Sequence, residues 1–421
     1  MTTSDQGHRE AFVWMWLPGA TEPVVAGKLT ADGQDLVFNY GRSYLARDQA
    51  ISLHEAELPL RTGVLPLKGG LHMPNCLRDA SPDAWGRRVI MNKVLGRSTA
   101  EMDTTELDEL TYLLSSGSDR IGALDFQQSP THYVPRLGGI STLEELMQAA
   151  DKVEQGIPLS PELDQALIHG SSIGGARPKA LIDDGERKLI AKFSSSSDLY
   201  SVVKAEFVAM RLAAVMGLEV APVSLTRAWG KDVLLIDRFD RQPAKDGWLR
   251  RHMVSALTLF ELDEMTARYA SYEKLGEIIR HRFAKPAATL RELFGRLVFN
   301  VLCGNTDDHA RNHAAFWDGK MMRLTPAYDI CPQPRAGNEA SQAMFIAGEN
   351  RMSRISSCLE AAPAFHLTRE EALHIALGQK TAIEAHWEAV CDEAQLSTVD
   401  RAVLWGRQFM NPYSVEGLAG D

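Results

Sequence analysis

Short apolar runs, turn signals and then helical periodicity follow one another in the first 150 residues. Alternating apolar and polar positions predict strands, with turns at Pro18-Gly19 and Asp32-Gly33. Ser81-Pro82-Asp83 predicts the start of a helix, with Ser81 as its cap and Pro82 in first position. The strands are expected at 12–17, 23–26 and 36–38, and further helices at 107–114 and 143–150. We expect an N-terminal α+β unit over 1–150, without evident catalytic residues.

A strand–loop–strand pattern comes next. Strands are expected at 180–182 and 189–193, joined by the hairpin signal Asp184-Gly185. Apolar residues at helical spacing predict a helix over 202–216 that ends at Gly217. The sequence also favours a strand pair, 219–226 and 232–236.

From about residue 248 onward the pattern is mostly helical. Apolar residues follow helical spacing closely from Leu290 to Leu302, and Gly304-Asn305 ends that pattern. A buried helix is thus expected to lead into the polar segment that follows it.

Composition narrows the class of protein. The 421 residues are enough for about two or three domains, and 45% hydrophobic and 24% charged residues are ordinary for a globular protein. The net charge of −10 disfavours direct binding to a nucleic-acid backbone. We interpret the local basic cluster as a solvated surface; its members are Arg238, Arg241, Arg250 and Arg251.

The cysteines and the N-terminus indicate the compartment. Five cysteines are scattered and form no CxxC pair, which favours reduced thiols over disulfides or a zinc site. No signal-peptide pattern is evident in the first ten residues, and the apolar run 11–17 is too short to span a bilayer. We expect a cytoplasmic protein that does not enter a membrane.

The segment 304–312, Gly-Asn-Thr-Asp-Asp-His-Ala-Arg-Asn, carries the strongest chemical signal. Four residues separate Asp307 from Asn312, the spacing at which protein kinases place a catalytic Asp and a Mg²⁺-binding Asn. Asp329 supplies a second carboxylate about one hairpin later, and oxygen ligands of this kind suit Mg²⁺. The alternative is a pair of ordinary polar turns.

Lys192 lies within the apolar strand 189–193. A buried lysine needs an anion, which ATP phosphates would supply, as would Glu206 on the following helix. The alternative is an edge-strand lysine whose amine reaches water.

A glycine-bearing loop, 174–179, precedes this strand pair. Its backbone N–H groups can approach phosphate, although it matches neither G-x-x-x-x-G-K-[ST] nor G-x-G-x-x-G. Ser171 and Ser172 lie just before it as candidate phosphorylation sites. Asp237, Arg238 and Phe239 leave a later strand, where the hinge of a two-lobed kinase binds adenine through backbone groups.

A rival interpretation uses a different set of side chains. Asp308, His309 and His313 are alternative metal ligands, because the two histidines are spaced four apart, as on one helix face. That set would indicate a metallohydrolase, but it leaves Lys192 and the glycine loop unexplained.

Taken together, these motifs resemble the HipA family of bacterial serine/threonine kinase toxins. The resemblance spans most of the chain. The matching segments are Leu58-Pro-Leu60, Ser172–Lys179, Asp237–Arg241, Thr306–Asn312 and Leu324–Asp329. It implies an α+β, two-lobed protein-kinase-like fold: an N-terminal α+β subdomain over 1–150, a kinase N-lobe over 151–245 and a mainly helical C-lobe over 246–421.

The resemblance also implies roles for matching positions. Asp307 would be catalytic, and Asn312 and Asp329 would hold Mg²⁺. Ser172, less so Ser171, would be autophosphorylated, which ejects the loop and shuts the enzyme off. ATP would contact Gly174, Gly175, Ala176, Arg177, Pro178, Lys179, Lys192, Asp237, Arg238, Phe239, His309, Arg311 and Tyr328.

Two positions depart from the familiar pattern of the family. Arg177-Pro178 replaces a Gln-Glu pair, and Asp308 replaces a Gly, adding a carboxylate that could bind a second metal or perturb the pKa of the base. The implied partners are a HipB-like helix-turn-helix antitoxin, operator DNA through that antitoxin alone, and an aminoacyl-tRNA synthetase as substrate. A catalytically silent corepressor and the metallohydrolase are the alternatives.

Overall fold

The structure is a computed structural model. It describes residues 8–95, 107–137, 141–157, 159–160, 162–163, 167, 172, 175, 177–195, 198 and 200–418. The chain divides into two compact units, and each is described by itself. The first contains the described residues up to 195, together with 227–253 and 317–319. The second contains those of 196–226, with 254–316 and 320–418. The three-part division into 1–150, 151–245 and 246–421 stays a prediction.

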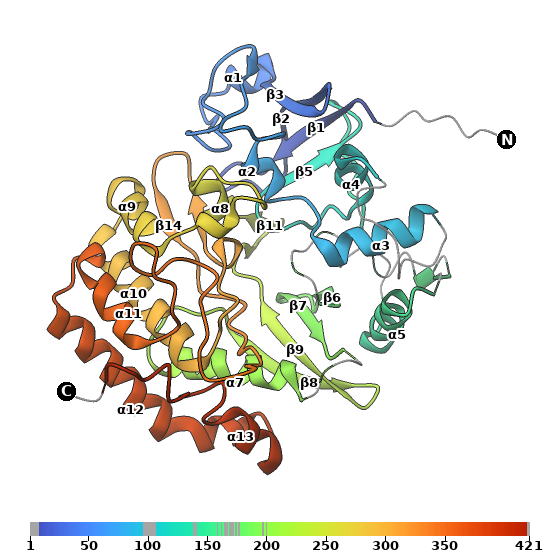
Figure 1. Cartoon of the computed structure of the whole chain (residues 1–421). Helices are drawn as coiled ribbons and strands as arrows, with labels where there is room; N and C mark the ends of the chain where they lie inside the picture. The colour runs from blue at the N-terminus through green and yellow to red at the C-terminus, as the bar shows by residue number, and fades with distance from the viewer. Residues whose placement is uncertain are drawn as a thin grey trace. The chain divides into compact units, whose positions relative to one another are not determined.

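The first unit holds an antiparallel sheet in the order β4-β3-β2-β1-β5 (Figure 1). Its strands are β1 (Glu10–Met15), β2 (Val24–Asp32), β3 (Asp35–Tyr40), β4 (Val64–Leu65) and β5 (Leu124–Gln127). The accompanying helices are α1 (Arg42–Leu45), α2 (Asn75–Arg78), α3 (Ala84–Leu95), α4 (Glu109–Ser115) and α5 (Leu143–Glu154). The strands predicted at 12–17 and 36–38 and the helices predicted at 107–114 and 143–150 are confirmed to within a few residues, whereas the strand predicted at 23–26 continues to Asp32.

The same unit contains the strands that carry the glycine loop and Lys192. Strands β6 (Lys179–Asp183), β7 (Lys188–Phe193) and β9 (Lys231–Asp237) are neighbours in that order and antiparallel. A hairpin, β10 (Arg241–Ala244) with β11 (Gly247–Arg250), follows them. Strand β8 (Val223–Ala228) precedes β9 across the turn at Trp229-Gly230.

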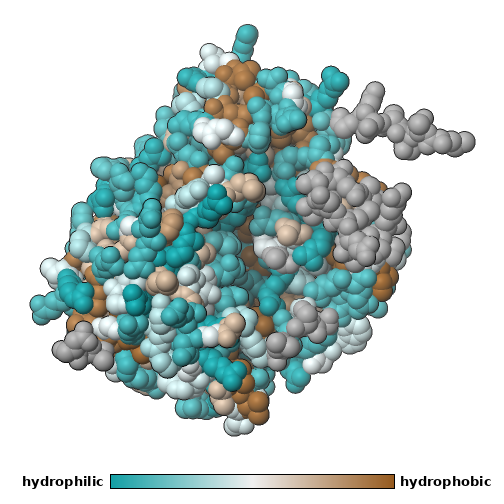
Figure 2. Space-filling model, viewed as in Figure 1, coloured by the Kyte–Doolittle hydropathy of each residue, from teal (hydrophilic) through white to brown (hydrophobic). Residues whose placement is uncertain are grey.

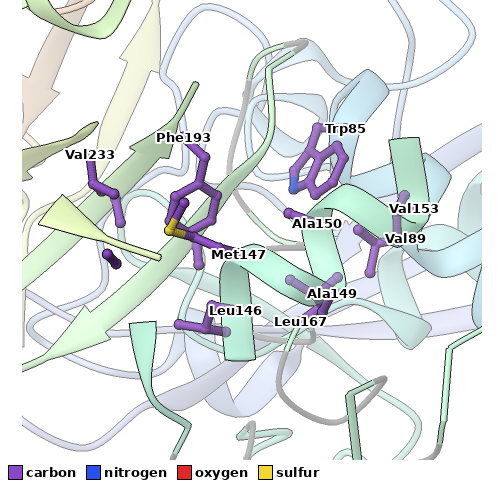
Figure 3. Packing of buried hydrophobic residues seen from close by; sticks show 13 residues of the cluster. Trp85, Val89, Leu146, Met147, Ala149, Ala150, Val153, Leu167, Phe193 and Val233 are labelled. Atoms are coloured by element: carbon purple, nitrogen blue, oxygen red, sulfur yellow. The ribbon is translucent and has the colours of Figure 1, made fainter. Parts of the chain in front are cut away.

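Helices α3 and α5 pack against these strands through one apolar cluster (Figure 3). Trp85 and Val89 of α3 meet Met147 and Ala150 of α5, while Phe193 of β7 faces them from the sheet. Burying large apolar side chains contributes roughly 1.5–3 kcal/mol each. The cluster therefore holds the strand that carries Lys192 against helices drawn from the first 155 residues.

Helix α3 begins later than the sequence pattern predicted. It starts at Ala84, and the Arg87 N–H donates to the Asp83 carbonyl, so Asp83 takes the place assigned to Ser81. The Pro82 carbonyl accepts a bond of 3.0 Å from Arg87 Nε, and the side-chain oxygen of Ser81 is buried without a partner. The Ser81 cap was therefore a wrong prediction.

The second unit is mainly helical, with one small sheet. Its helices are α7 (Val202–Val215), α8 (Ala256–Leu259), η3 (Ala267–Tyr269), α9 (Tyr272–Arg282), α10 (Pro286–Cys303), η4 (Ala310–Asn312), α11 (Ile355–Ala361), η5 (Ala362–Phe365), α12 (Arg369–Glu393) and α13 (Thr398–Leu404). Helix α12 packs against α7 and α10 (Figure 1). Strands β12 (Met253–Ser255), β13 (Ala314–Trp317) and β14 (Met322–Leu324) form a sheet in that order, which the helical pattern had not predicted.

Arg238 and Arg241 are not solvated, contrary to the interpretation of the basic cluster. Their side chains are 0% and 1% exposed. Each forms ion pairs of 2.7–3.0 Å with Asp119 and Asp240. Burial opposes the charge on Asp119, but the two guanidinium groups outweigh it and hold the pKa of that carboxyl well below its usual range. The sequence pattern could not show that Asp119, about 120 positions earlier in the chain, lies beside these arginines.

The cysteines agree with the sequence interpretation, since they are free thiols. The face in Figure 2 is mostly hydrophilic, with hydrophobic residues in small separate patches. None of the helices in the described part of the chain has the length and hydrophobicity that a bilayer-spanning segment needs. All five cysteines are buried free thiols.

Candidate active site

Helix α10 delivers the segment that carries Asp307. Residues 293–303 of this helix are all buried, and the helix ends at Gly304, whose φ of 73° is left-handed. A Cβ at Gly304 would lie 2.6 Å from the Gln408 carbonyl oxygen, so this close approach requires glycine. The loop that follows is also bonded at its start, since the Ala343 N–H donates to the Thr306 carbonyl at 3.1 Å. The segment therefore leaves a fixed helix end.

Asp307 and Asn312 meet within this segment. Asp307 is exposed, whereas Asn312 is 8% exposed and donates from Nδ2 to the Asp307 carbonyl oxygen at 3.2 Å. The loss of hydration around Asp307 raises the pKa of its carboxyl, His309 lowers it, and the charge of Asp329 raises it further. The charge of Asp329, 22 positions later in the chain, thus acts on the carboxyl of Asp307.

Asp329 has an unusual backbone. Its φ is 58°, in the left-handed region that non-glycine residues seldom occupy, although Asp tolerates it better than most. Such conformations cluster at functional sites. The two residues before it are bonded: the Ala327 N–H donates to the Glu219 carbonyl at 2.7 Å, and the Tyr328 hydroxyl donates to the Arg311 carbonyl at 2.7 Å. Tyr328 therefore joins the Asp329 segment to the loop that carries Asp307 and Asn312.

Asp308 points away from this site. Its side chain is 2% exposed and accepts hydrogen bonds from the Tyr272 hydroxyl, from Asn300 Nδ2 at 2.7 Å and from His313 Nε2 at 3.0 Å. The expectation of an added carboxylate that binds a second metal or perturbs the base was wrong. The sequence alone could not show that adjacent aspartates face opposite environments.

The metallohydrolase interpretation is also contradicted. His309 and His313 flank the short helix η4 instead of sharing one α-helical face, and His313 is buried against Asp308. Among the described residues, no group of three or more His, Cys, Asp or Glu side chains is arranged to hold a metal ion.

Two further residues of this segment were candidates for ATP contact. Arg311 is half-buried and pairs with Glu264 at 2.5 Å. The Tyr328 hydroxyl is occupied by the bond to Arg311 described above. Their roles toward ATP, like that of His309, stay predictions.

In the first unit, the glycine loop is bonded to the start of helix α3. The Gly175 N–H donates to the Asp83 carboxylate at 2.7 Å, and the Trp85 N–H donates to the Gly175 carbonyl at 3.3 Å. Gly175 has a φ of 103°, and a Cβ there would collide with the Lys179 amine. The left-handed backbone at this position thus favours glycine. Gly174, Ala176 and Ser171 lie outside the described residues.

Lys179 and Lys192 lie directly opposite each other on β6 and β7. Opposed residues of an antiparallel pair project from the same face of the sheet, and these two side chains are 4% and 7% exposed. Strand β7 lies between β6 and β9, so the interpretation of Lys192 as an edge-strand residue is wrong. Glu206 is 1% exposed and belongs to the other unit; its pairing with Lys192 stays a prediction.

The other described loop residues are buried or half-buried. Ser172 is 2% exposed and its hydroxyl donates to the Asp119 carbonyl at 3.4 Å. The Pro178 carbonyl accepts from the Phe193 N–H at 3.1 Å. Arg177 is half-buried.

In the predicted adenine hinge, Asp237–Phe239, the backbone N–H and the side chain of Arg238 already form hydrogen bonds within the protein. The Arg238 N–H donates to the Lys188 carbonyl at 2.8 Å, and its side chain is held by Asp119 and Asp240. Asp237 lies 3.5 Å from Arg187, and Phe239 is half-buried. Arg238 therefore cannot offer its own N–H to adenine in this conformation, and contacts through Asp237 and Phe239 stay predictions.

Sequence reasoning missed several residues that build these sites. Asp83 and Asp119 come from the N-terminal region that was expected to carry no chemistry. Tyr272 and Asn300 belong to helices that showed only apolar periodicity. A buried polar residue inside an apolar helix, such as Asn300, was the one available signal.

Comparisons with known proteins agree with this geometry. Residues 171–395 match the HipA-like C-terminal domain, and residues 20–127 match the HipA N-terminal domain. The chain belongs to the HipA family, which confirms the resemblance drawn from the motifs.

Two relatives and one structure illustrate the similarity. Y4mE of Sinorhizobium fredii is 28% identical over 333 residues, covering 73% of this chain and 74% of Y4mE. The serine/threonine-protein kinase toxin HipA of Shewanella oneidensis is 30% identical over 183 residues, covering 38% of this chain and 42% of HipA. The Shewanella oneidensis structure of HipA with HipB and operator DNA has a TM-score of 0.67 at 19% identity and covers 93% of each chain. The fold is therefore a kinase-like α+β fold, as expected.

Proposed function

We propose that this protein is an ATP- and Mg²⁺-dependent serine/threonine protein kinase that acts as the toxin of a type II toxin–antitoxin system. The observation that carries the proposal is the hydrogen bond from Asn312 Nδ2 to the Asp307 carbonyl, which brings the two residues of the motif together; the charge of Asp329 also raises the pKa of Asp307. One exposed carboxylate beside two oxygen ligands is the set that phosphoryl transfer uses. Membership of the HipA family supports the same assignment.

Asp307 orients the hydroxyl of the protein substrate and accepts its proton. Its raised pKa suits a group that takes up a proton near a second carboxylate. The side-chain oxygens of Asn312 and Asp329 suit Mg²⁺, because this ion prefers carboxylate and amide oxygens together with substrate phosphates. When bound, Mg²⁺ neutralises the charge that develops on the transferred phosphoryl group.

Lys179 and Lys192 bind phosphate oxygens of ATP in this proposal. Two ammonium groups opposite each other on one face of a sheet form a positive site to which phosphate oxygens can bind. The backbone around Gly175 lies beside the Lys179 amine, which favours phosphate binding by the loop as well. Adenine is assigned to the backbone of Asp237 and Phe239.

Ser172 is the proposed site of autophosphorylation. Its hydroxyl is buried against the Asp119 carbonyl, so the loop must leave this position before Ser172 can accept a phosphoryl group. A phosphoserine could not return to this buried site without a large desolvation cost. Modification would therefore hold the loop away from the position it has here.

The partners are proposed from the family. A HipB-like helix-turn-helix antitoxin is the expected protein partner, because HipA of Shewanella oneidensis was solved with HipB and operator DNA. A net charge of −10 fits a protein that reaches DNA only through a basic partner. The proposed substrate is an aminoacyl-tRNA synthetase, whose phosphorylation would halt translation.

Incubation with γ-³²P-labelled ATP, Mg²⁺ and a cell lysate, followed by mass spectrometry of labelled sites, tests the proposal. We expect label on serine or threonine, and a loss of at least about 10²-fold in rate for Asp307→Ala. Asp48→Ala, which removes an equally exposed aspartate of the other unit, is the matched control and should keep full activity.

Wild-type rates in Asp307→Ala would refute the assigned role. Nucleotide binding without any label transfer would favour the alternative, a catalytically silent corepressor.

A further inference from the structure

Asp308 is buried although its neighbour Asp307 is exposed. A single carboxylate oxygen, Oδ2, receives all three bonds already described, from Tyr272, Asn300 and His313. The Tyr272 hydroxyl, Asn300 Nδ2 and His313 Nε2 surround this oxygen from three parts of the chain. Three donors compensate a charge that would otherwise be costly to bury.

The three donors come from three elements of the same unit. Tyr272 is the first residue of α9, Asn300 lies in the last turn of α10, and His313 follows η4. The Tyr272 ring also meets the His313 ring edge-on, with centroids 5.5 Å apart. Asp308 thus connects two helices to the end of the catalytic loop.

The beginning of the loop is held by the same cluster. Asn300 accepts at Oδ1 from Asn305 Nδ2 at 3.0 Å, and its carbonyl accepts from the Asn305 N–H at 2.9 Å. Asn300 and Asn305 are 3% and 1% exposed. Residues 305 and 313, at the two ends of the loop, are therefore bonded within one buried polar cluster.

The peptide bond between Asp307 and Asp308 transmits the restraint on Asp308 to Asp307 and Asn312. The Asp307 carbonyl belongs to the peptide plane that leads into Asp308, so holding Asp308 fixes the direction of that carbonyl. The carbonyl is the acceptor for Asn312 Nδ2. Fixing Asp308 thus orients the proposed base and the proposed metal ligand together.

We propose that Asp308 is a positioning residue for phosphoryl transfer, acting through Tyr272, Asn300 and His313 to set the Asp307–Asn312 geometry. The proposal rests on the function assigned to Asp307 above. Asp308 touches neither substrate nor metal in this role. Loosening the cluster lowers the maximal rate of transfer more than it weakens the binding of ATP, because the proposed phosphate-binding lysines belong to the other unit.

Tyr272→Phe is the most specific test, because it removes one donor and keeps the buried ring. Tyr44→Phe is the matched control: Tyr44 is also fully buried and its hydroxyl donates to the Ile51 carbonyl at 2.8 Å in the other unit. The measurements are the maximal rate of ³²P transfer from ATP and the ATP concentration at half of that rate, below the unfolding temperature of each variant.

We expect Tyr272→Phe to lower the maximal rate about tenfold, with a half-saturating ATP concentration within about twofold of wild type. Tyr44→Phe should keep both values. Asp308→Asn retains one acceptor oxygen and should retain more activity than Asp308→Ala. Hydrogen exchange of amides 305–312 should quicken in Tyr272→Phe and stay unchanged in Tyr44→Phe.

A wild-type rate together with wild-type exchange in Tyr272→Phe would overturn the inference. Equal rate losses in Tyr272→Phe and Tyr44→Phe would also overturn it, because they would indicate general destabilisation. If Asp307→Ala is inactive and Tyr272→Phe is fully active, only the role of Asp308 fails. If Asp307→Ala is active, the proposed function fails first.

Discussion

The Tyr328 hydroxyl donates a 2.7 Å hydrogen bond to the carbonyl oxygen of Arg311. Asp329 and Asn312 are the two proposed metal ligands. The bond joins Tyr328, the residue before Asp329, to Arg311, the residue before Asn312. Both ligands therefore depend on one contact between segments that lie 17 positions apart in the chain.

Tyr328→Phe should weaken this connection. Loss of the hydroxyl leaves the Arg311 carbonyl without its donor, which costs about 1 kcal/mol in free energy of unfolding. We expect the Mg²⁺ concentration needed for half-maximal ³²P transfer to rise, because the ligands are held less firmly. Tyr269→Phe, an exposed tyrosine of the same unit, is the control and should change neither quantity. An unchanged Mg²⁺ requirement would contradict this view.

Asp329→Gly should separate stability from function. Glycine adopts a φ of 58° without strain, so the thermal unfolding temperature should hold or rise, by the equivalent of up to about 1 kcal/mol. Transfer of ³²P should nevertheless be lost, because the carboxylate is gone. Asp329→Ala removes the same carboxylate but keeps the strain, and should unfold at a lower temperature than Asp329→Gly. Residual wild-type activity in both variants would exclude Asp329 as a metal ligand.

Lys192→Met should reduce binding of ATP. In wild type, ATP with Mg²⁺ should raise the thermal unfolding temperature, since a ligand that binds the folded state stabilises it. The variant should show a clearly smaller rise, because one of the two opposed ammonium groups is missing. Lys231→Met, on the neighbouring strand β9 and half-exposed, should show the full rise. If ATP with Mg²⁺ raised the unfolding temperature of the wild type and of Lys192→Met equally, Lys192 would not contribute to nucleotide binding.

His252 makes stability depend on pH. Burial lowers the pKa of His252 from 6.5 to about 4, partly offset by the bond from Nε2 to the Leu53 carbonyl at 2.6 Å. Its Nδ1 is buried without a partner, so a second proton would have no acceptor. The unfolded state therefore takes up a proton that the folded state does not.

The stabilising effect of neutral His252 is fully present above pH 6.5 and is lost as the pH falls toward 4. The loss amounts to about 3 kcal/mol at most, at 1.36 kcal/mol per pKa unit. Urea unfolding at several pH values should show this decline. His252→Gln should flatten it over this range, and a slope equal to that of wild type would show that other groups cause the decline.

The sequence by itself determined most of the helices and strands and the types of residue at the proposed site. Apolar spacing predicted α7 and α10, the Asp184-Gly185 signal predicted the β6–β7 hairpin, and the spacing of Asp307, Asn312 and Asp329 indicated phosphoryl transfer. These features are local, because helix periodicity, turn chemistry and short motifs depend on residues close together in the chain. The family resemblance rested on the same local motifs.

Only the tertiary structure decided which polar residues are buried and what they contact. Asp307 and Asp308 are adjacent in sequence, yet one is exposed and the other is bonded to Tyr272, 36 positions away. The sequence indicated that Arg238 and Arg241 are surface charges. In the structure both are buried beside Asp119, about 120 positions earlier in the chain. Such contacts depend on which elements pack together, and the desolvation and pairing energies that follow have no counterpart in a local pattern.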